Sequence, residues 1–117
     1  MTSKLSRSFL VLVLSVVAMG GAIVLATGAG AVAGPTIALK DNYFDPKEAT
    51  VKVGDTVTWK WEGSNPHDVV VKAGPKKFKS KVKRDGTYTR KITKPGKYRI
   101  VCTLHSGMEM TLRATAA

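Results

Sequence analysis

The chain has 117 residues, which suits one domain with a modest core, and it carries 19 Lys and Arg against 8 Asp and Glu, for a formal net charge of +11. Its single cysteine excludes an internal disulfide, and its two histidines are too few for a multi-copper oxidase. The basic surface favours acidic proteins, anionic membranes or cell-wall polymers as partners, whereas nucleic acid is not expected because no nucleic-acid-binding motif is present.

An uncharged, apolar run from Phe9 to Ala33 dominates the start of the chain. Lys4 and Arg7 precede this run, and the small residues Ala31-Val-Ala33 end it. This pattern is typical of a secretory signal peptide, so we expect residues 1–33 to be removed by cleavage after Ala33. An uncleaved membrane anchor is the alternative, because about 20 apolar residues span a bilayer. In both cases residues 34–117 should be exported: periplasmic, extracellular or attached to the outer side of the cytoplasmic membrane.

Beyond Gly34 the sequence predicts short strands separated by turns. Apolar and polar residues alternate within them, so that Val57, Trp59 and Trp61 share one face, and Gly54-Asp55 predicts a hairpin turn. The expected strands are 36–40, 49–53, 56–61, 69–72, 77–83, 87–92, 97–102 and 111–115. No stretch keeps a helical period over three turns, so residues 34–117 should form one all-β domain, a two-sheet antiparallel β-sandwich.

Basic residues gather in one part of the chain, around the expected strand 77–83. They are Lys72, Lys76, Lys77, Lys79, Lys81, Lys83 and Arg84. Alternating lysines put the charge on one face of that strand. Such a face either docks an acidic partner or keeps a sheet edge from pairing with another sheet.

The potential metal ligands are concentrated near the end of the chain. Cys102, His105 and Met108 lie within seven consecutive residues, and the only other histidine is His67. Every Cys and His of the chain can therefore belong to one metal site. Two imidazoles, a thiolate and a weak thioether select copper for electron transfer. Zinc is the chemical alternative, but structural zinc prefers four good donors and methionine is a poor one.

The chain resembles the small type 1 (blue) copper proteins of the plastocyanin, amicyanin and pseudoazurin group, the cupredoxins, over almost all of 36–112. The matching motifs are Phe44-Asp-Pro46, Val51-Lys-Val-Gly-Asp-Thr-Val-Thr-Trp59, Pro66-His-Asp-Val69, Phe78-Lys-Ser80, Gly86-Thr-Tyr88, Pro95-Gly-Lys-Tyr98 and the run from Cys102 to Met108. The resemblance implies a Greek-key sandwich with copper at one end and with His67, Cys102 and His105 as equatorial ligands. It also implies outer-sphere electron transfer with no substrate bound at the metal.

The resemblance offers two methionines as the axial ligand. Amicyanin-like members place this methionine where Met108 stands, whereas pseudoazurin-like members use a later one, here Met110. We expect Met108, because Leu112 and Ala114 then continue the inward alternation of the last strand. Asp68 departs from the resemblance, since many members have asparagine there to tie the two ligand loops together.

These observations predict an exported, monomeric one-electron carrier that is not an enzyme and that exchanges electrons with redox partner proteins through acidic docking surfaces on those partners. The resemblance also implies that electrons pass through the edge of His105, within an apolar patch that Leu104, Pro66 and Gly107 would form here. Two other functions remain open. One is a copper carrier or buffer with the same ligands, and the other is a metal-free, basic interaction sandwich.

Overall fold

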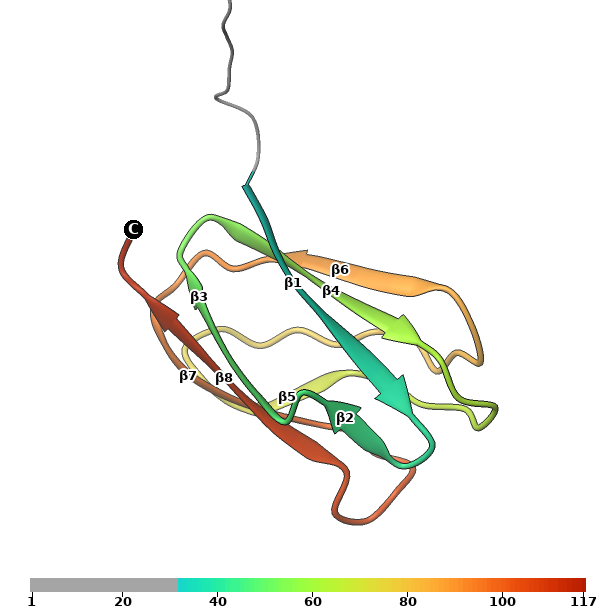
Figure 1. Cartoon of the computed structure of the whole chain (residues 1–117). Coiled ribbons are helices and arrows are strands. Elements are labelled where there is room, and N and C mark those ends of the chain that lie inside the picture. The colour runs from blue at the N-terminus through green and yellow to red at the C-terminus, as the bar shows by residue number, and fades with distance from the viewer. Residues whose placement is uncertain (1–31) are drawn as a thin grey trace, which may run out of the picture. The chain divides into compact units, whose positions relative to one another are not determined.

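The computed structural model describes residues 32–117, which form two four-stranded sheets packed face to face (Figure 1). The first sheet has the order β2-β1-β4-β6, with β1 at Val32–Lys40, β2 at Tyr43–Asp45, β4 at Asp55–Trp61 and β6 at Thr87–Lys91. The second has the order β3-β8-β7-β5, with β3 at Glu48–Lys52, β5 at Val70–Ala73, β7 at Gly96–Val101 and β8 at Glu109–Thr115. The all-β sandwich is confirmed.

The predicted signal peptide or anchor lies outside the described residues, except for its last two positions. Val32 and Ala33 begin β1, where they pair with Asp55 and Thr56 of β4. No helix capable of spanning a bilayer occurs within residues 32–117. Cleavage after Ala33 stays a prediction.

The core forms where the inward faces of the two sheets meet. In β4 the predicted face of Val57, Trp59 and Trp61 is buried, and in β8 the buried residues alternate with exposed ones. The Trp59 ring lies 5.9 Å, centroid to centroid, from the rings of both Phe78 and Tyr88. Alternation with a period of two is thus the sequence signal that sets which side chains fill the sandwich.

The sheets are mixed, which differs from the purely antiparallel pairing expected from the turn signals. β1 pairs with β4 in parallel, and β3 pairs with β8 in parallel. The Gly54-Asp55 turn does not close a hairpin, because β3 and β4 belong to different sheets. Gly54 has a φ of +105°, which suits glycine, and its turn carries the chain across the sandwich.

Residues 77–83 do not form the expected strand. They make only isolated bridges to β5 and its preceding loop, Val70 with Lys79 and His67 with Lys83. Regular pairing is interrupted because the hydroxyl of Ser80 accepts the Val69 N–H at 2.9 Å. The lysines therefore run along the edge of the second sheet instead of covering one face of a strand.

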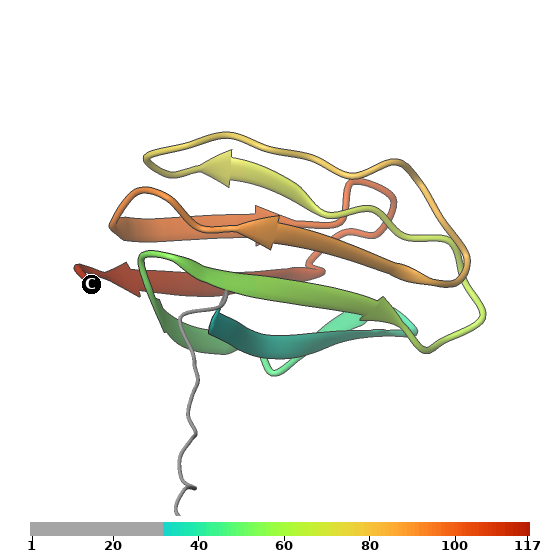
Figure 2. The same ribbon diagram turned by 90° about the horizontal axis from the view of Figure 1, so that it is seen from above.

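The two ends of the sandwich are made of different loops (Figure 2). We call one the loop end; it comprises 62–68, 83–86 and 102–108, which are joined by backbone hydrogen bonds such as Trp61 N to Gly86 O and His67 N to Lys83 O. The other, the terminal end, comprises 52–55, 73–76 and 91–97, and lies where β1 begins and β8 ends.

Candidate metal centre

His67 is held rigidly at the loop end, although it precedes β5 instead of lying within a strand. Its backbone N–H and C=O both pair with Lys83, at 2.9 Å each. Its carbonyl also accepts a hydrogen bond from Nε1 of Trp61 at 3.1 Å. The imidazole is fully buried. The predicted ligand is thus fixed by main-chain contacts on both sides.

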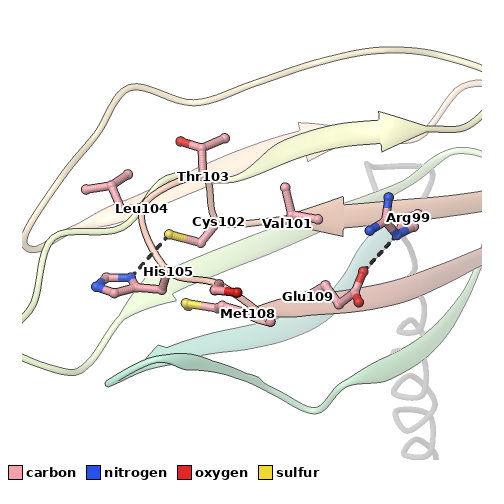
Figure 3. A pocket seen from close by; sticks show the side chains of 10 residues that line it. Arg99, Val101, Cys102, Thr103, Leu104, His105, Met108 and Glu109 are labelled. Carbon is pink, nitrogen blue, oxygen red and sulfur yellow. Dashed lines mark hydrogen bonds and ion pairs between the residues drawn. The ribbon is translucent and has the colours of Figure 1, made fainter.

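Cys102 directly follows β7, and the loop after it folds back over its side chain (Figure 3). The Cys102 N–H donates to the Met108 carbonyl at 3.0 Å, and the Met108 N–H donates to the His105 carbonyl at 3.3 Å. Gly107 has a φ of +81° in this loop, a conformation that glycine adopts without steric cost. The short return brings His105 and Met108 to the same side as the thiol.

The three strongest donor atoms form a compact triangle. The Nδ1 atoms of His67 and His105 are 3.2 Å apart, and Sγ of Cys102 lies 3.7 and 3.6 Å from them, respectively. A point equidistant from the three lies about 2.0 Å from each, close to the ~2.0–2.1 Å of metal–nitrogen bonds and the ~2.3 Å of metal–sulfur bonds. The described residues therefore fit a metal ion without rearrangement.

The two methionines occupy different environments, although both are buried. Met108 lines a pocket of about 340 Å³ together with Cys102 and His105, and Figure 3 shows its side chain beside theirs. Met110 lies within β8, pairs with Ile100 of β7 and does not line this pocket, although both methionines belong to the hydrophobic core. Met108 is thus the thioether next to the donor triangle.

The protonation of His67 suits a metal ligand. Burial lowers the pKa of its imidazole below the usual 6.5, and the neighbouring His105 lowers it further, while Asp41 acts in the opposite direction. A neutral imidazole is the form that binds a metal. Nε2 of His67 lies 3.8 Å from Oδ1 of Asp41 and has no closer hydrogen-bond partner among residues 32–117.

A buried carboxylate connects the two ligand-bearing segments. Asp68 accepts a hydrogen bond from the Thr103 N–H at 2.7 Å and another from the Thr103 hydroxyl at 2.6 Å. Many members of the group that the chain resembles have asparagine at position 68. Here Asp68 ties the segment that contains His67 to the segment that contains Cys102. The sequence alone gave no hint that Thr103 is its partner.

Asp41 is a supporting residue that sequence reasoning missed. Its carboxylate accepts the N–H groups of Ser64 at 3.0 Å and Asn65 at 2.9 Å, and thereby anchors the loop before His67 to the end of β1. A side chain at Gly63 would collide with this carboxylate. The Asp41-Asn42 pair is a turn signal that could have identified the role, because aspartate in turns accepts nearby backbone N–H groups.

Two residues of the predicted apolar patch, Leu104 and Gly107, line the same pocket as Cys102 and His105. Leu104 is 42% exposed, His105 and Pro66 are half-buried, and Gly107 is exposed. An exposed leucine next to a half-buried ligand makes a small apolar surface at the loop end.

Comparisons with known proteins point in one direction. Residues 36–115 match the family model described as copper binding proteins, plastocyanin/azurin family. Amicyanin-alpha of Methylorubrum extorquens is 34% identical over 70 residues, which are 56% of this chain and 59% of that protein, less than two thirds of its length.

Solved structures agree with this match. An amicyanin variant in its Cu(I) form superposes with a TM-score of 0.63 at 28% identity, over 70% of this chain and 82% of that chain. The Cu-containing nitrite reductase (NirK) from Thermus scotoductus SA-01 gives a TM-score of 0.62 at 27% identity, over 70% of this chain but only 22% of that chain.

Proposed function

Because the chain belongs to the plastocyanin/azurin family of copper-binding proteins, we propose that it carries single electrons between redox partner proteins. It is a small type 1 copper protein, and its cofactor is copper. We assign His67, Cys102 and His105 as the equatorial ligands and Met108 as the axial one. The nitrite reductase that it resembles is an enzyme in which the match covers about a fifth of the chain. We propose no enzymatic activity for this chain.

The donor triangle of His67, Cys102 and His105 is the observation that supports this function most. Copper bound there supplies a one-electron couple between its cuprous and cupric states. The chain's part is to hold the donors still, through the His67–Lys83 main-chain pair and the Cys102–Met108 hydrogen bond. Donors that move little when an electron arrives keep the reorganisation cost of electron transfer low.

Electrons are proposed to pass through the edge of His105, because this half-buried ligand opens onto the exposed Leu104. Lys83 and Arg84 lie at the loop end, and Lys79 and Lys81 lead toward it along the sheet edge. These basic residues are proposed to steer an acidic partner to the copper end. Charge of this kind raises association rates more than it raises affinity.

The test is a titration of the metal-free protein with Cu(II), followed by visible absorption. We expect an intense band from thiolate-to-copper charge transfer. Cys102→Ser should lose this band while far-UV circular dichroism stays that of a β-sandwich. A colourless copper complex of the unaltered protein would contradict the proposal, and so would equal thermal stability with and without copper, since a ligand that binds only the folded state must raise stability.

A copper carrier with the same ligands would hand over the copper ion itself, whereas an electron carrier hands over electrons and keeps its copper. Stopped-flow mixing with a redox partner measures electron exchange, and mixing with a copper chelator measures metal loss. An electron carrier should cycle reversibly and release copper slowly, whereas rapid transfer of copper to the chelator would favour the copper carrier.

Export is proposed from the apolar run before Gly34, and mass spectrometry of the exported protein tests cleavage after Ala33.

A further inference from the structure

The terminal end carries an excess of unpaired positive charge. Its lysines all have exposed side chains, and none forms an ion pair within residues 32–117. They are Lys52, Lys76, Lys91, Lys94 and Lys97. The acidic side chain placed among them is that of Asp55, whose carboxylate accepts the Lys52 N–H at 3.0 Å. This end of the molecule is therefore strongly basic.

The loop end is closer to neutral, because its basic residues Lys40, Lys60, Lys83 and Arg84 are balanced by acidic ones. Five of the chain's acidic residues lie there, namely Asp41, Glu62, Asp68, Asp85 and Glu109. Two of these are paired, Glu62 with Lys40 and Glu109 with Arg99. The net charge of the domain is thus concentrated toward the end that lies away from the metal ligands. Basic residues that served only solubility would be spread evenly over the surface and would not give the two ends different net charges.

A small pocket at the terminal end collects three cationic side chains. Lys76, Arg90 and Lys91 line a space of about 180 Å³ beside Phe78 and Tyr98. The Arg90 guanidinium lies 5.2 Å from the centre of the Phe78 ring, a cation–π contact that orients it. Arginine and lysine together are the side chains that bind phosphate groups. The pocket therefore suits the phosphate of a larger anion.

The position of this surface argues against a redox partner as its occupant. Gly96 at the terminal end and Val101 at the loop end are the first and last residues of β7, and five steps of about 3.3 Å separate them by roughly 17 Å. A partner docked on the terminal lysines would sit a full strand length away from His105. The surface suits a contact that holds the molecule and leaves the copper end free.

The course of the chain indicates what that contact is. β1 begins at Val32, which pairs with Asp55 at the terminal end. The residues that precede Val32 in the sequence include the uncharged apolar run that starts at Phe9. When this run is retained as a membrane anchor, the alternative to cleavage after Ala33, the lysines around the start of β1 lie next to the bilayer and are attracted to anionic lipids.

We propose that the terminal end is a membrane-contact surface for anionic lipid headgroups. The pocket of Lys76, Arg90 and Lys91 receives a headgroup phosphate, and the surrounding lysines contact the charged surface. The metal ligands then face away from the lipid, toward partners in solution. This inference goes beyond electron transfer and does not depend on it.

The test is lysine footprinting of the full chain added to lipid vesicles. Vesicles of phosphatidylcholine alone are compared with vesicles that also contain phosphatidylglycerol, and a water-soluble amine reagent with mass spectrometry reports each lysine. In the anionic vesicles we expect labelling of Lys76, Lys91, Lys94 and Lys97 to slow by about threefold or more, and high salt to restore it. Lys60, near the loop end, should label equally in both.

A charge-reversed variant sharpens the test. Lys91→Glu with Lys94→Glu should remove the difference between the two vesicles, whereas Lys47→Glu with Lys60→Glu, which changes the net charge equally, should keep it. Circular dichroism checks that both variants are folded. Equal labelling in both vesicles, or protection of Lys60 instead, would overturn the proposal. Protection by inorganic phosphate alone, with nothing added by anionic vesicles, would also overturn it, because the pocket would then serve a free anion.

Discussion

The carboxylate of Asp68 holds Thr103 by two hydrogen bonds, from the backbone N–H at 2.7 Å and from the hydroxyl at 2.6 Å. Asp68 directly follows His67, and Thr103 directly follows Cys102. Two ligands that lie 35 residues apart in the sequence are therefore positioned through one buried acid. The separation of imidazole and thiolate depends on this contact as well as on the ligands themselves.

Replacing Asp68 should loosen the site. Asp68→Ala leaves the Thr103 N–H without its acceptor, and we expect the free energy of unfolding of the metal-free protein to fall by about 1–3 kcal/mol. Asp68→Asn keeps one acceptor oxygen and should lose less. Urea denaturation measures both. The exposed Asp45 provides the control, since Asp45→Ala should stay within about 0.5 kcal/mol; an equal loss in both alanine variants would contradict the role of Asp68.

The axial ligand can be identified by a matched pair of variants. Met108→Leu should change the visible spectrum and raise the reduction potential, because the axial thioether tunes both. Met110→Leu exchanges side chains of similar volume in the core and should cost less than about 1.5 kcal/mol, with the spectrum unchanged. Spectroscopy and voltammetry on the copper-loaded variants give the answer. The reverse pattern would show that Met110 is the ligand.

The electron route predicts a strong effect at an exposed leucine. Leu104→Lys places a charge in the apolar patch beside His105, so electron exchange with a partner should slow while the copper spectrum stays nearly the same. Thr50→Lys, on the exposed face of β3, adds the same charge elsewhere and should have little effect. Stopped-flow rates compare the two. Equal rates for Leu104→Lys and the unaltered protein would mean that electrons leave by another path.

The basic edge of the second sheet predicts an effect on association. Lys77→Glu, Lys79→Glu and Lys81→Glu combined should lower the association rate with an acidic redox protein, most strongly at low ionic strength where charges are least screened. A control with the same change in net charge reverses Lys47, Lys52 and Lys91. If both triple variants slow association equally, only the net charge matters. If neither does so at low salt, the edge lysines only keep the sheet from pairing with another.

The Asp41 contacts predict a pH-dependent stability. Hydrogen bonds from the backbone of Asn65 and then Ser64 lower the pKa of this carboxyl below its usual 3.8. Its contribution to stability is therefore present above about pH 3.8 and is lost as the pH falls further, when the carboxyl takes up a proton in the folded state. The melting temperature of Asp41→Asn should lie below that of the unaltered protein at neutral pH, and the gap should narrow in acid. A gap of the same size at neutral and at acidic pH would contradict this role of Asp41.

The strands were largely predictable because each carries its own signal. Alternation placed Val57, Trp59 and Trp61 on the buried face without any knowledge of their neighbours. The sequence of a strand carries no such local signal for which other strand it will pair with. The turn at Gly54 looks the same whether the next strand returns beside the last or crosses to the opposite sheet, and only the packing of both layers decides this. The expected strand at 77–83 failed for a related reason, because a single hydroxyl, that of Ser80, replaces a ladder hydrogen bond.

The grouping of His67, Cys102 and His105 followed from counting residues, since the chain has no other cysteine or histidine. The contacts that hold these three side chains in place could not be predicted from the sequence. Lys83 and Asp41 support His67 from segments that are distant in sequence and bear no metal-binding pattern. Supporting residues of this kind depend on the fold, so the structure is needed to find them.

The two ends of the described chain lie together, because Val32 pairs with Asp55 and Thr115 pairs with Lys52. A segment fused after Ala117, two residues beyond Thr115, would therefore emerge on the side opposite His105. A peptide tag there could fix the molecule to an electrode or a bead in one orientation, with the loop end turned outward. The same closeness would let a short linker join the two ends, so that new termini could be opened in an exposed turn far from the ligands.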